Sequence, residues 1–309
     1  MRRPSISVAG AANFDLISYI ERMPRTGETI HGRRFGMGCG GKGANQAVMA
    51  AKLGAEVTMV AKLGDDIFGH RTLENFKSFG VKTDHVHLTD KALSGVAPIT
   101  VDREGNNSII IVTGANDLLT VEELEAARRD IAAAGLLITQ LEIPLEATLC
   151  AMRIAREEGA VNLFNPAPAF ADLPDEIFVL SDIICPNETE AELLTGIRAD
   201  NLEGAEQAGR ALLEKGAKIV VMTLGGNGSL IMEKDTSIHV RGIQVDAKDT
   251  TGAGDCFIGS FAYFYACGLP LDEAARRANR IAAISVQRPG TQISYPDAAE
   301  LPEDIFESL

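Results

Sequence analysis

The chain has 309 residues, of which 46% are hydrophobic, and it carries a formal charge of −14. This length can bury a large core as one domain, and a strongly acidic surface repels nucleic acids and acidic membranes. No apolar run reaches the length of a membrane span, and no dense stripe of Lys and Arg interrupts the acidic balance. We therefore expect a soluble globular protein with no nucleic-acid partner and no membrane partner.

The cysteines and the first residues indicate a reducing compartment. The five cysteines are odd in number, scattered, and without a Cys-x-x-Cys pair. Neither a disulfide framework nor a zinc site follows from such a pattern. Residues 1–4 lead directly into a strand-like segment and not into the apolar core of a signal peptide. We expect a cytoplasmic location.

Short apolar runs alternate with helix-like stretches along the chain. The predicted strands are 6–9, 57–61, 136–141, 161–164, 183–185 and 218–223. The predicted helices are 44–53, 69–79, 121–134 and 145–158, each ended by a glycine. This alternation is typical of an α/β fold whose sheet is mostly parallel.

Two segments, 17–35 and 94–112, break the alternation. In the second, apolar runs at 96–101 and 108–112 flank a turn at 102–107, a pattern that predicts a β-hairpin. A small sheet built from both segments would stand outside the main sheet. Its apolar face would need a role as a lid or a contact with a partner subunit.

Polar residues and glycines gather directly after the predicted strands. In open α/β sheets ligands bind at the carboxyl ends of the strands, so these residues are site candidates. Loops are polar in most proteins, and that alone explains about half of such positions. The candidates are Asn13, Asp15, Asp65, Asp66, Glu142, Asn165, Asn187, Glu190, Thr223, Gly225 and Gly228.

A glycine-rich cluster spans residues 36–46 and nearly matches two nucleotide-binding motifs. As a P-loop it lacks the Ser or Thr that binds magnesium, because Gly43 stands there. As a dinucleotide fingerprint it lacks an acidic ribose ligand, because the next strand offers Lys62. The cluster fits a backbone that approaches a small polar ligand closely, with Lys42 and Asn45 bonding its hydroxyls. A simple helix start is the alternative.

The run 249–255, Asp-Thr-Thr-Gly-Ala-Gly-Asp, precedes an apolar helical stretch at 256–266. Small residues at Gly252, Ala253 and Gly254 allow successive backbone N–H groups to point at one anion, and the helix dipole favours negative charge there. Asp255 would lie where a hydroxyl could lose its proton. This is the outline of a phosphoryl-transfer site, although a tight turn with a capping Asp is the simpler alternative.

Both motifs together resemble those of the ribokinase-like family of ATP-dependent sugar kinases, and the resemblance covers essentially the whole chain. The family's two signatures match residues 40–47 and 249–255. Residues 165–168, 187–190, 223–228 and 290–296 also resemble family segments, with Asn187 and Glu190 in an Asn-x-x-Glu element. The resemblance implies a single doubly wound α/β domain over 1–309, with helices flanking the sheet. It further implies a small β-sheet lid from approximately 16–35 and 94–113, which closes over the sugar and often joins a homodimer.

The resemblance also implies the reaction and its residues. ATP would phosphorylate the 5-hydroxyl of D-ribose, giving D-ribose 5-phosphate and ADP. Asp255 would be the base, beside an anion hole of Gly252, Ala253 and Gly254. Besides Asp255, the sugar ligands would be Asn13, Asp15, Gly41, Lys42, Asn45 and Glu142.

Nucleotide and cations are assigned by the same resemblance. The expected ATP-binding residues are Asn187, Thr223, Gly225, Gly228, Gly254 and Asn279. Mg²⁺ would lie near Asn187 and Glu190. A potassium ion would be held, mostly by carbonyl groups, at Asp249, Thr251, Ser285, Arg288, Gly290 and Ser294.

Other functions remain open at this point. Deoxyribokinases are similar but place Met at the position of Asn13, where an amide suits the 2-hydroxyl of ribose. Ala11 departs from the family, since many relatives have Ser there. Another pentose or nucleoside kinase, or a sugar-binding sensor without catalysis, is possible, whereas Lys62 argues against a nicotinamide oxidoreductase.

Overall fold

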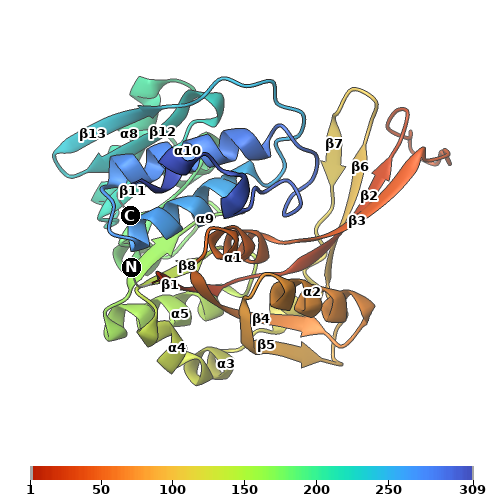
Figure 1. Ribbon diagram of the computed structural model, residues 1–309, viewed down its shortest axis with the longest axis horizontal. Helices are drawn as coiled ribbons and strands as arrows, with labels where there is room; N and C mark the ends of the chain where they lie inside the picture. The colour runs from red at the N-terminus through yellow and green to blue at the C-terminus, as the bar shows by residue number, and fades with distance from the viewer. Residues whose placement is uncertain (1–2, 308–309) are drawn as a thin grey trace.

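The computed structural model describes residues 3–307 as a nine-stranded sheet between layers of helices, with a separate four-stranded sheet at one side (Figure 1). In spatial order, the large sheet contains β13 (Thr236–Arg241), β12 (Gly228–Glu233), β11 (Ile219–Thr223), β10 (Ile183–Ile184), β9 (Val161–Phe164), β8 (Leu136–Thr139), β1 (Ser5–Ala9), β4 (Glu56–Gly64) and β5 (Lys82–Thr89). Every neighbouring pair is parallel except β11–β12 and β12–β13. The predicted α/β class and mostly parallel sheet are confirmed, although β5, β12 and β13 were not among the predicted strands.

Strand β1 shows why the sheet needs helices on both faces. Ile6 and Val8 pack into a core cluster with α1 (Lys42–Lys52), α9 (Ala253–Ala266) and α10 (Leu271–Ser285). Ala9, on the other face, joins a cluster with α3 (Val121–Ala126), α4 (Arg128–Ala133) and α5 (Leu145–Glu158). Successive side chains of a strand point to opposite faces, so a strand buried on both sides is apolar throughout. The doubly wound arrangement is therefore confirmed.

The remaining helices complete the two layers. They are α2 (Ile67–Ser78), α6 (Asp175–Leu180), α7 (Glu188–Thr195) and α8 (Leu202–Glu214), with short 3₁₀ turns η1 (Gly114–Leu118), η2 (Gly225–Asn227), η3 (Ala298–Glu300) and η4 (Glu303–Phe306). The single helix predicted over 121–134 is wrong in one respect: it is two helices, because the N–H of Ala127 bonds the Leu124 carbonyl three residues back. Within residues 3–307 no helix is both long and apolar enough to span a bilayer.

The four-stranded sheet, called the small sheet below, has the order β3 (Arg34–Gly40), β2 (Asn13–Tyr19), β6 (Gly95–Val101) and β7 (Asn107–Ile109). The hairpin expected in the second segment is confirmed as the antiparallel pair β6–β7. The first segment differs from the expected bounds, since β2 begins at Asn13 and β3 includes part of the glycine cluster. Gly40 pairs with Asn13, and a Cβ on Gly40 would lie 2.5 Å from Oδ1 of Asp15. Glycine is used there because the Asp15 carboxylate occupies the space.

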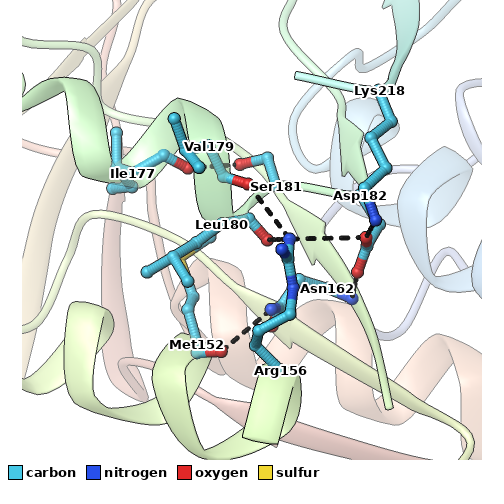
Figure 2. Close-up of polar contacts among 9 residues, drawn as sticks. All are labelled: Met152, Arg156, Asn162, Ile177, Val179, Leu180, Ser181, Asp182 and Lys218. Carbon is cyan, nitrogen blue, oxygen red and sulfur yellow. Dashed lines mark hydrogen bonds and ion pairs between the residues drawn. The ribbon is translucent and has the colours of Figure 1, made fainter. Parts of the chain in front are cut away.

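At the amino ends of the strands, the carboxylate of Asp182 joins several elements (Figure 2). It accepts hydrogen bonds from Lys218 Nζ at 2.6 Å, from the backbone N–H of Asn162 at 2.8 Å and from Arg156 Nη2 at 3.5 Å. Arg156 Nη2 also donates to the carbonyls of Val179 and Leu180, both at 3.0 Å. Asp182 therefore links the beginnings of β9, β10 and β11, and Arg156 connects it to α5 and to the end of α6.

We predict that Asp182→Ala lowers the free energy of unfolding by about 1–3 kcal/mol, because the backbone N–H of the buried Asn162 loses its acceptor and Lys218 and Arg156 each lose a contact. Urea denaturation monitored by circular dichroism measures the change. The matched control is Asp200→Ala, which removes an exposed ion pair with Arg198 and should change stability by less than about 1 kcal/mol. Equal effects of the two substitutions would contradict the assignment.

Candidate functional site

The first turn of α9 offers unpaired backbone donors. Gly252 is the N-cap in a left-handed conformation with φ of 75°, and the Tyr295 hydroxyl donates to its carbonyl at 2.8 Å. A Cβ on Gly252 would lie 2.6 Å from that hydroxyl, so only glycine fits. The N–H of Ala253 donates to the Thr250 carbonyl, but within residues 3–307 the N–H groups of Gly254 and Asp255 have no acceptor. Together with the helix dipole, these two groups favour an anion.

Asp255 lies in this first turn with its carboxylate held at both oxygens. Asn45 Nδ2 donates to Oδ2 at 2.9 Å, and Gln46 Nε2 donates to Oδ1 at 2.8 Å. Gln46 also donates to Asn165 Oδ1 at 3.1 Å and accepts from Gln140 Nε2 at 2.7 Å. The side chain of Asp255 is 8% exposed and therefore has one preset orientation.

A chain of amides supports Asn45 from behind. Gln292 Nε2 donates to Asn45 Oδ1 at 3.0 Å, and Asn75 Nδ2 on α2 donates to Gln292 Oε1 at 2.8 Å. Sequence reasoning missed Gln46, Gln140, Gln292 and Asn75 as members of the site. Gln46 and Gln292 lay inside recognised motifs, which was the available signal; Asn75 and Gln140 carried none.

A cavity of about 160 Å³ opens against the start of α9. It is lined by Lys42, Asn165, Ala167, Cys185, Asn187, Glu190, Thr223, Thr250, Gly252, Ala253, Gly254, Asp255 and Ile258. Burial opposes the charge of Lys42, but the carboxylates of Asp255, Glu142 and Glu190 outweigh it and raise the pKa of the ammonium group. The cavity therefore combines a cation with N–H groups that have no acceptor among residues 3–307, which suits a phosphate group.

The start of α7 forms one wall of this cavity. Asn187 Oδ1 accepts from the Glu190 N–H at 2.8 Å, and Glu190 Oε2 accepts from the Asn187 N–H at 2.9 Å. Burial raises the pKa of Glu190. Asn187 also forms a parallel bridge with Thr223, so these three predicted residues lie together.

Three other predicted nucleotide residues lie outside the lining of the cavity. Gly225 and Gly228 lie in and directly after η2. Gly228 has a φ of 98°, and a Cβ there would lie 2.2 Å from the Val240 carbonyl. On α10, Asn279 Nδ2 donates to Ser229 Oγ at 3.1 Å and to the same Val240 carbonyl at 3.3 Å. These three residues lie together beside the start of β12, where backbone groups and the Asn279 amide form a second set of polar contacts.

Asp15 on β2 is a buried carboxyl group close to two others. Its pKa is raised to about 7, chiefly by burial and also by the charges of Glu142 and Asp255, whereas a hydrogen bond from Thr291 lowers it. The Thr291 hydroxyl lies 3.5 Å from Asp15 Oδ2. Asp15 lines a second cavity of about 260 Å³ between the small sheet and the loops 247–251 and 289–291.

The start of α1 brings Lys42, Glu142 and Asn13 together. Glu142 Oε2 accepts from the Lys42 N–H at 2.9 Å, and burial raises the pKa of Glu142. Gly41, the N-cap, has a φ of 88°, and a Cβ on it would lie 2.6 Å from the Asn13 backbone N. The glycine cluster thus allows the helix start to contact the β1–β2 connection directly.

The residues expected at a monovalent-cation site lie in two adjoining loops, except Ser285, which is the last residue of α10. Asp249 accepts from the N–H groups of Thr251 at 3.0 Å and Gly290 at 2.8 Å, joining the loops. The Ser285 and Ser294 hydroxyls bond carbonyls of their own segments, and the Arg288 side chain pairs with Glu300. Besides the Asp249 carboxylate, backbone carbonyls are therefore the groups that these loops could offer to an ion.

Two site candidates are wrong. Asp66 caps α2 by accepting from the N–H groups of Phe68 and Gly69, and it also accepts from the Ser94 hydroxyl. Asp65 pairs with His70 on the exposed surface. The Asp66 carboxylate therefore starts α2, as Asp commonly does at helix N-termini, and Asp65 forms a surface pair with a side chain of the same helix. Across residues 3–307 no cluster of three His, Cys, Asp or Glu side chains could hold a metal.

Comparison with known proteins shows that the chain is similar to carbohydrate kinases in both sequence and structure. Residues 3–298 match the family described as pfkB family carbohydrate kinase. The chain is 46% identical over 306 residues to a ribokinase of Mus musculus, covering 98% of this chain and 95% of that protein. It is 42% identical over 298 residues to a deoxyribokinase of Salmonella typhi, covering 96% and 97%. The structure of Arabidopsis thaliana ribokinase complexed with ribose and ATP matches with a TM-score of 0.88 and 33% identity, covering 97% of each chain.

We predict that Asp15 makes stability depend on pH. Its pKa is about 7 in the folded protein, whereas the ordinary value for an Asp carboxyl is 3.8, so the folded state binds more protons between these values. Its contribution to stability is therefore greatest below about pH 4 and is lost as pH rises toward 7. Relative to Asp15→Asn, the wild type should lose about 2–3 kcal/mol between about pH 5 and pH 8.

Urea denaturation at a series of pH values measures this difference. Asp90→Asn, at an exposed position, is the control and should give a flat difference. A flat difference for Asp15→Asn as well would show that its carboxyl group titrates normally in the folded protein.

Proposed function

The chain belongs to the pfkB family of carbohydrate kinases, and we propose that it transfers the γ-phosphoryl group of ATP to the 5-hydroxyl of D-ribose. It is a phosphotransferase with an alcohol group as acceptor. The observation that carries the proposal is Asp255, fixed by Asn45 and Gln46 beside two unpaired N–H groups. The products would be D-ribose 5-phosphate and ADP.

In the proposed mechanism, Asp255 accepts the proton of the attacking hydroxyl. Phosphoryl transfer passes through a loose transition state with charge on the equatorial oxygens, so fixed donors contribute more than base strength. The α9 start supplies these donors, with Gly252, Ala253 and Gly254 forming the wall of the anion hole. Because both carboxylate oxygens of Asp255 already accept amide donors, little reorganisation is needed when the hydroxyl arrives.

The sugar would lie between the small sheet and the start of α1. Asn13 and Asp15 share one face of β2, while Gly41, Lys42, Asn45 and Glu142 approach from α1 and the β8–α5 loop. Carboxylate acceptors and an ammonium donor can bond several hydroxyls at once. The amide of Asn13 favours ribose over 2-deoxyribose, since a missing 2-hydroxyl would leave it unpaired.

ATP would approach from the opposite side of Asp255. Asn187, Thr223 and Gly254 line the first cavity, while Gly225, Gly228 and Asn279 lie beside the start of β12. The Arabidopsis thaliana ribokinase, a chain of the same fold, is complexed with ribose and ATP. That likeness supports the proposal that this chain binds ribose and ATP.

Two cations fit the residues present. Mg²⁺ is commonly held by one or two carboxylates together with phosphates and water, so the partly buried Glu190 beside Asn187 suffices without a larger acidic cluster. When bound, it would neutralise charge on the phosphates. The adjoining loops at Asp249, Thr251 and Gly290 offer one carboxylate and neutral carbonyls, which suits a potassium ion, and the carbonyls of Ser285, Arg288 and Ser294 would complete its ligands.

We further propose that the small sheet closes over the sugar as a lid and joins two copies in a homodimer. Its strands and the residues after β7 carry exposed apolar side chains at Phe35, Met37, Ile109, Ile110 and Ile111. Exposed apolar groups of this size on one element usually mark a contact surface. A second copy of the same sheet would cover them symmetrically.

A cytoplasmic location is proposed from the cysteines. All five are free, and none is paired in a disulfide within the described part of the chain. Free thiols persist in reducing compartments.

We predict that Asp255→Asn lowers kcat by about 10²–10⁴-fold, because the proton acceptor is lost. ADP release from Mg-ATP with D-ribose measures the rate. The control Asp246→Asn, at an exposed position in the preceding loop, should leave the rate unchanged.

The same assay, run with 2-deoxy-D-ribose and with or without potassium, separates the alternatives. Ribose turnover that potassium raises supports the proposal as a whole. Preference for 2-deoxyribose would assign the chain as a deoxyribokinase, and no turnover of either sugar would point to another acceptor or to a sugar-binding sensor. Unchanged activity without potassium would contradict the cation site alone.

For the dimer, we predict that Phe35→Asp combined with Ile110→Glu halves the mass measured by light scattering after gel filtration. Charges placed at a buried apolar interface are strongly unfavourable. Ile238→Glu, an exposed apolar position on β13, is the control and should leave a dimer intact. A monomeric wild type would rule out the proposed contact.

A further inference from the structure

Asn13 has a buried partner that sequence reasoning did not identify. Asn116, in η1, donates from Nδ2 to Asn13 Oδ1 at 2.8 Å. The two side chains are 1% and 3% exposed, respectively, and they are 103 residues apart in the sequence. A buried amide pair of this kind constrains both side chains because neither can turn to water.

The surrounding backbone fixes which end of each amide faces the other. Asn116 Oδ1 accepts from the N–H of Ala12 at 3.0 Å, and a backbone N–H can only donate. Asn116 Nδ2 lies 2.9 Å from the Thr113 carbonyl and 3.3 Å from the Ala12 carbonyl, which can only accept. The assignment of oxygen and nitrogen in Asn116 is therefore unambiguous, and Asn13 must turn its oxygen toward it.

The consequence is that Asn13 offers only N–H donors elsewhere. Its Nδ2 has no partner among residues 3–307. Asn13 lies two residues before Asp15 on β2, so both side chains leave the same face of the strand, and Asp15 lines the second cavity. A donor and a carboxylate acceptor thus stand next to each other.

A hydroxyl placed between them has one proton and two lone pairs. It donates that proton to the Asp15 carboxylate and must then accept from its other neighbour. We propose that Asn116 is a positioning residue that holds Asn13 as a hydrogen-bond donor, and that this orientation sets the preference of the site for ribose over 2-deoxyribose. The inference rests on the proposed sugar kinase function.

The small sheet contributes the space for this contact. Gly95 on β6 is the register partner of Asn13. A Cβ on Gly95 would lie 2.2 Å from Asn13 Oδ1 and 2.3 Å from Asn116 Nδ2. Contacts this short force a shift, so Gly95→Ala disturbs the pair without changing either amide.

The main test is Asn116→Asp. The carboxylate keeps an acceptor for the Ala12 N–H but cannot donate, so Asn13 must turn its NH₂ group toward it and present oxygen to the sugar. Two acceptors then compete for one hydroxyl proton. We expect the ratio of kcat/KM for D-ribose to that for 2-deoxy-D-ribose to fall about tenfold, mainly through KM for ribose.

The assay is run at about pH 8, where the Asp15 carboxyl is ionised, since its pKa is about 7. Asp117→Asn, an exposed change in the same turn, should keep the wild-type ratio. In an Asn13→Met background, adding Asn116→Asp should leave the ratio unchanged within about twofold, because the partner amide is gone. If Asn116 had a purely structural role, Asn116→Asp would lower the ribose-to-deoxyribose ratio equally with Asn13 and with Met at position 13. Alternatively, it would lower kcat/KM for both sugars and leave their ratio unchanged.

Two further measurements keep the outcomes distinct. If Asn116→Asp does not fold, Gly95→Ala takes its place with the same expected fall in the ratio. Calorimetric titration with each sugar gives the ratio of dissociation constants without turnover. Absence of ADP release by the wild type would then refute the kinase function alone, whereas an unchanged binding ratio in the variants would refute the role of Asn116.

Discussion

The site depends on one buried charge, the carboxylate of Asp255 at the start of α9. An ionised carboxylate removed from water is stable only if its oxygens find donors. Asn45 and Gln46 provide them from α1, which packs against α9 through the core. The side chains can reach Asp255 only because α1 begins close to the β1–β2 connection. Gly43, whose Cβ would lie 2.8 Å from Gly10, shows how close that approach is.

The remaining charges of the site follow from that packing. Besides burial, the charges of Glu142 and Asp255 raise the pKa of Asp15, and the charge of Asp255 raises the pKa of Glu142, while Lys42 lies among these groups as the counter-charge. Burial raises the pKa of Asp15 and Glu142 because it destabilises their ionised forms. Hydrogen bonds donated by ligand hydroxyls would stabilise those ionised forms. A polyhydroxylated ligand therefore suits this group of carboxyl side chains.

Much of the fold could be predicted from the sequence, because periodicity and glycine stops report on backbone and burial directly. The core strands and the helices at 44–53 and 145–158 are examples. Strand β3 could not be predicted, since its alternate glycines have low strand propensity, and one of them, Gly40, leaves space for Asp15. Nor could the break at Ala127, where alanine favours a continuous helix.

The site divides in the same way. Residues in glycine motifs or directly after strands could be predicted as candidates, because local geometry selects them. Asp65 and Asp66 were false candidates, since an Asp after a strand can equally well cap the next helix, as Asp66 does, or pair with a side chain of that helix, as Asp65 does with His70. Asn116 and Gln140 act through contacts about 100 residues away in sequence, and no local pattern encodes such a contact. Strand β2 has a mechanical consequence of its own: it leaves β1 through residues 10–12 and extends for about 20 Å at ~3.3 Å per residue. A rotation of the small sheet about that connection moves Tyr19 far and Asn13 little. Access of solvent to the second cavity can therefore change while Asn13, next to the connection, hardly moves.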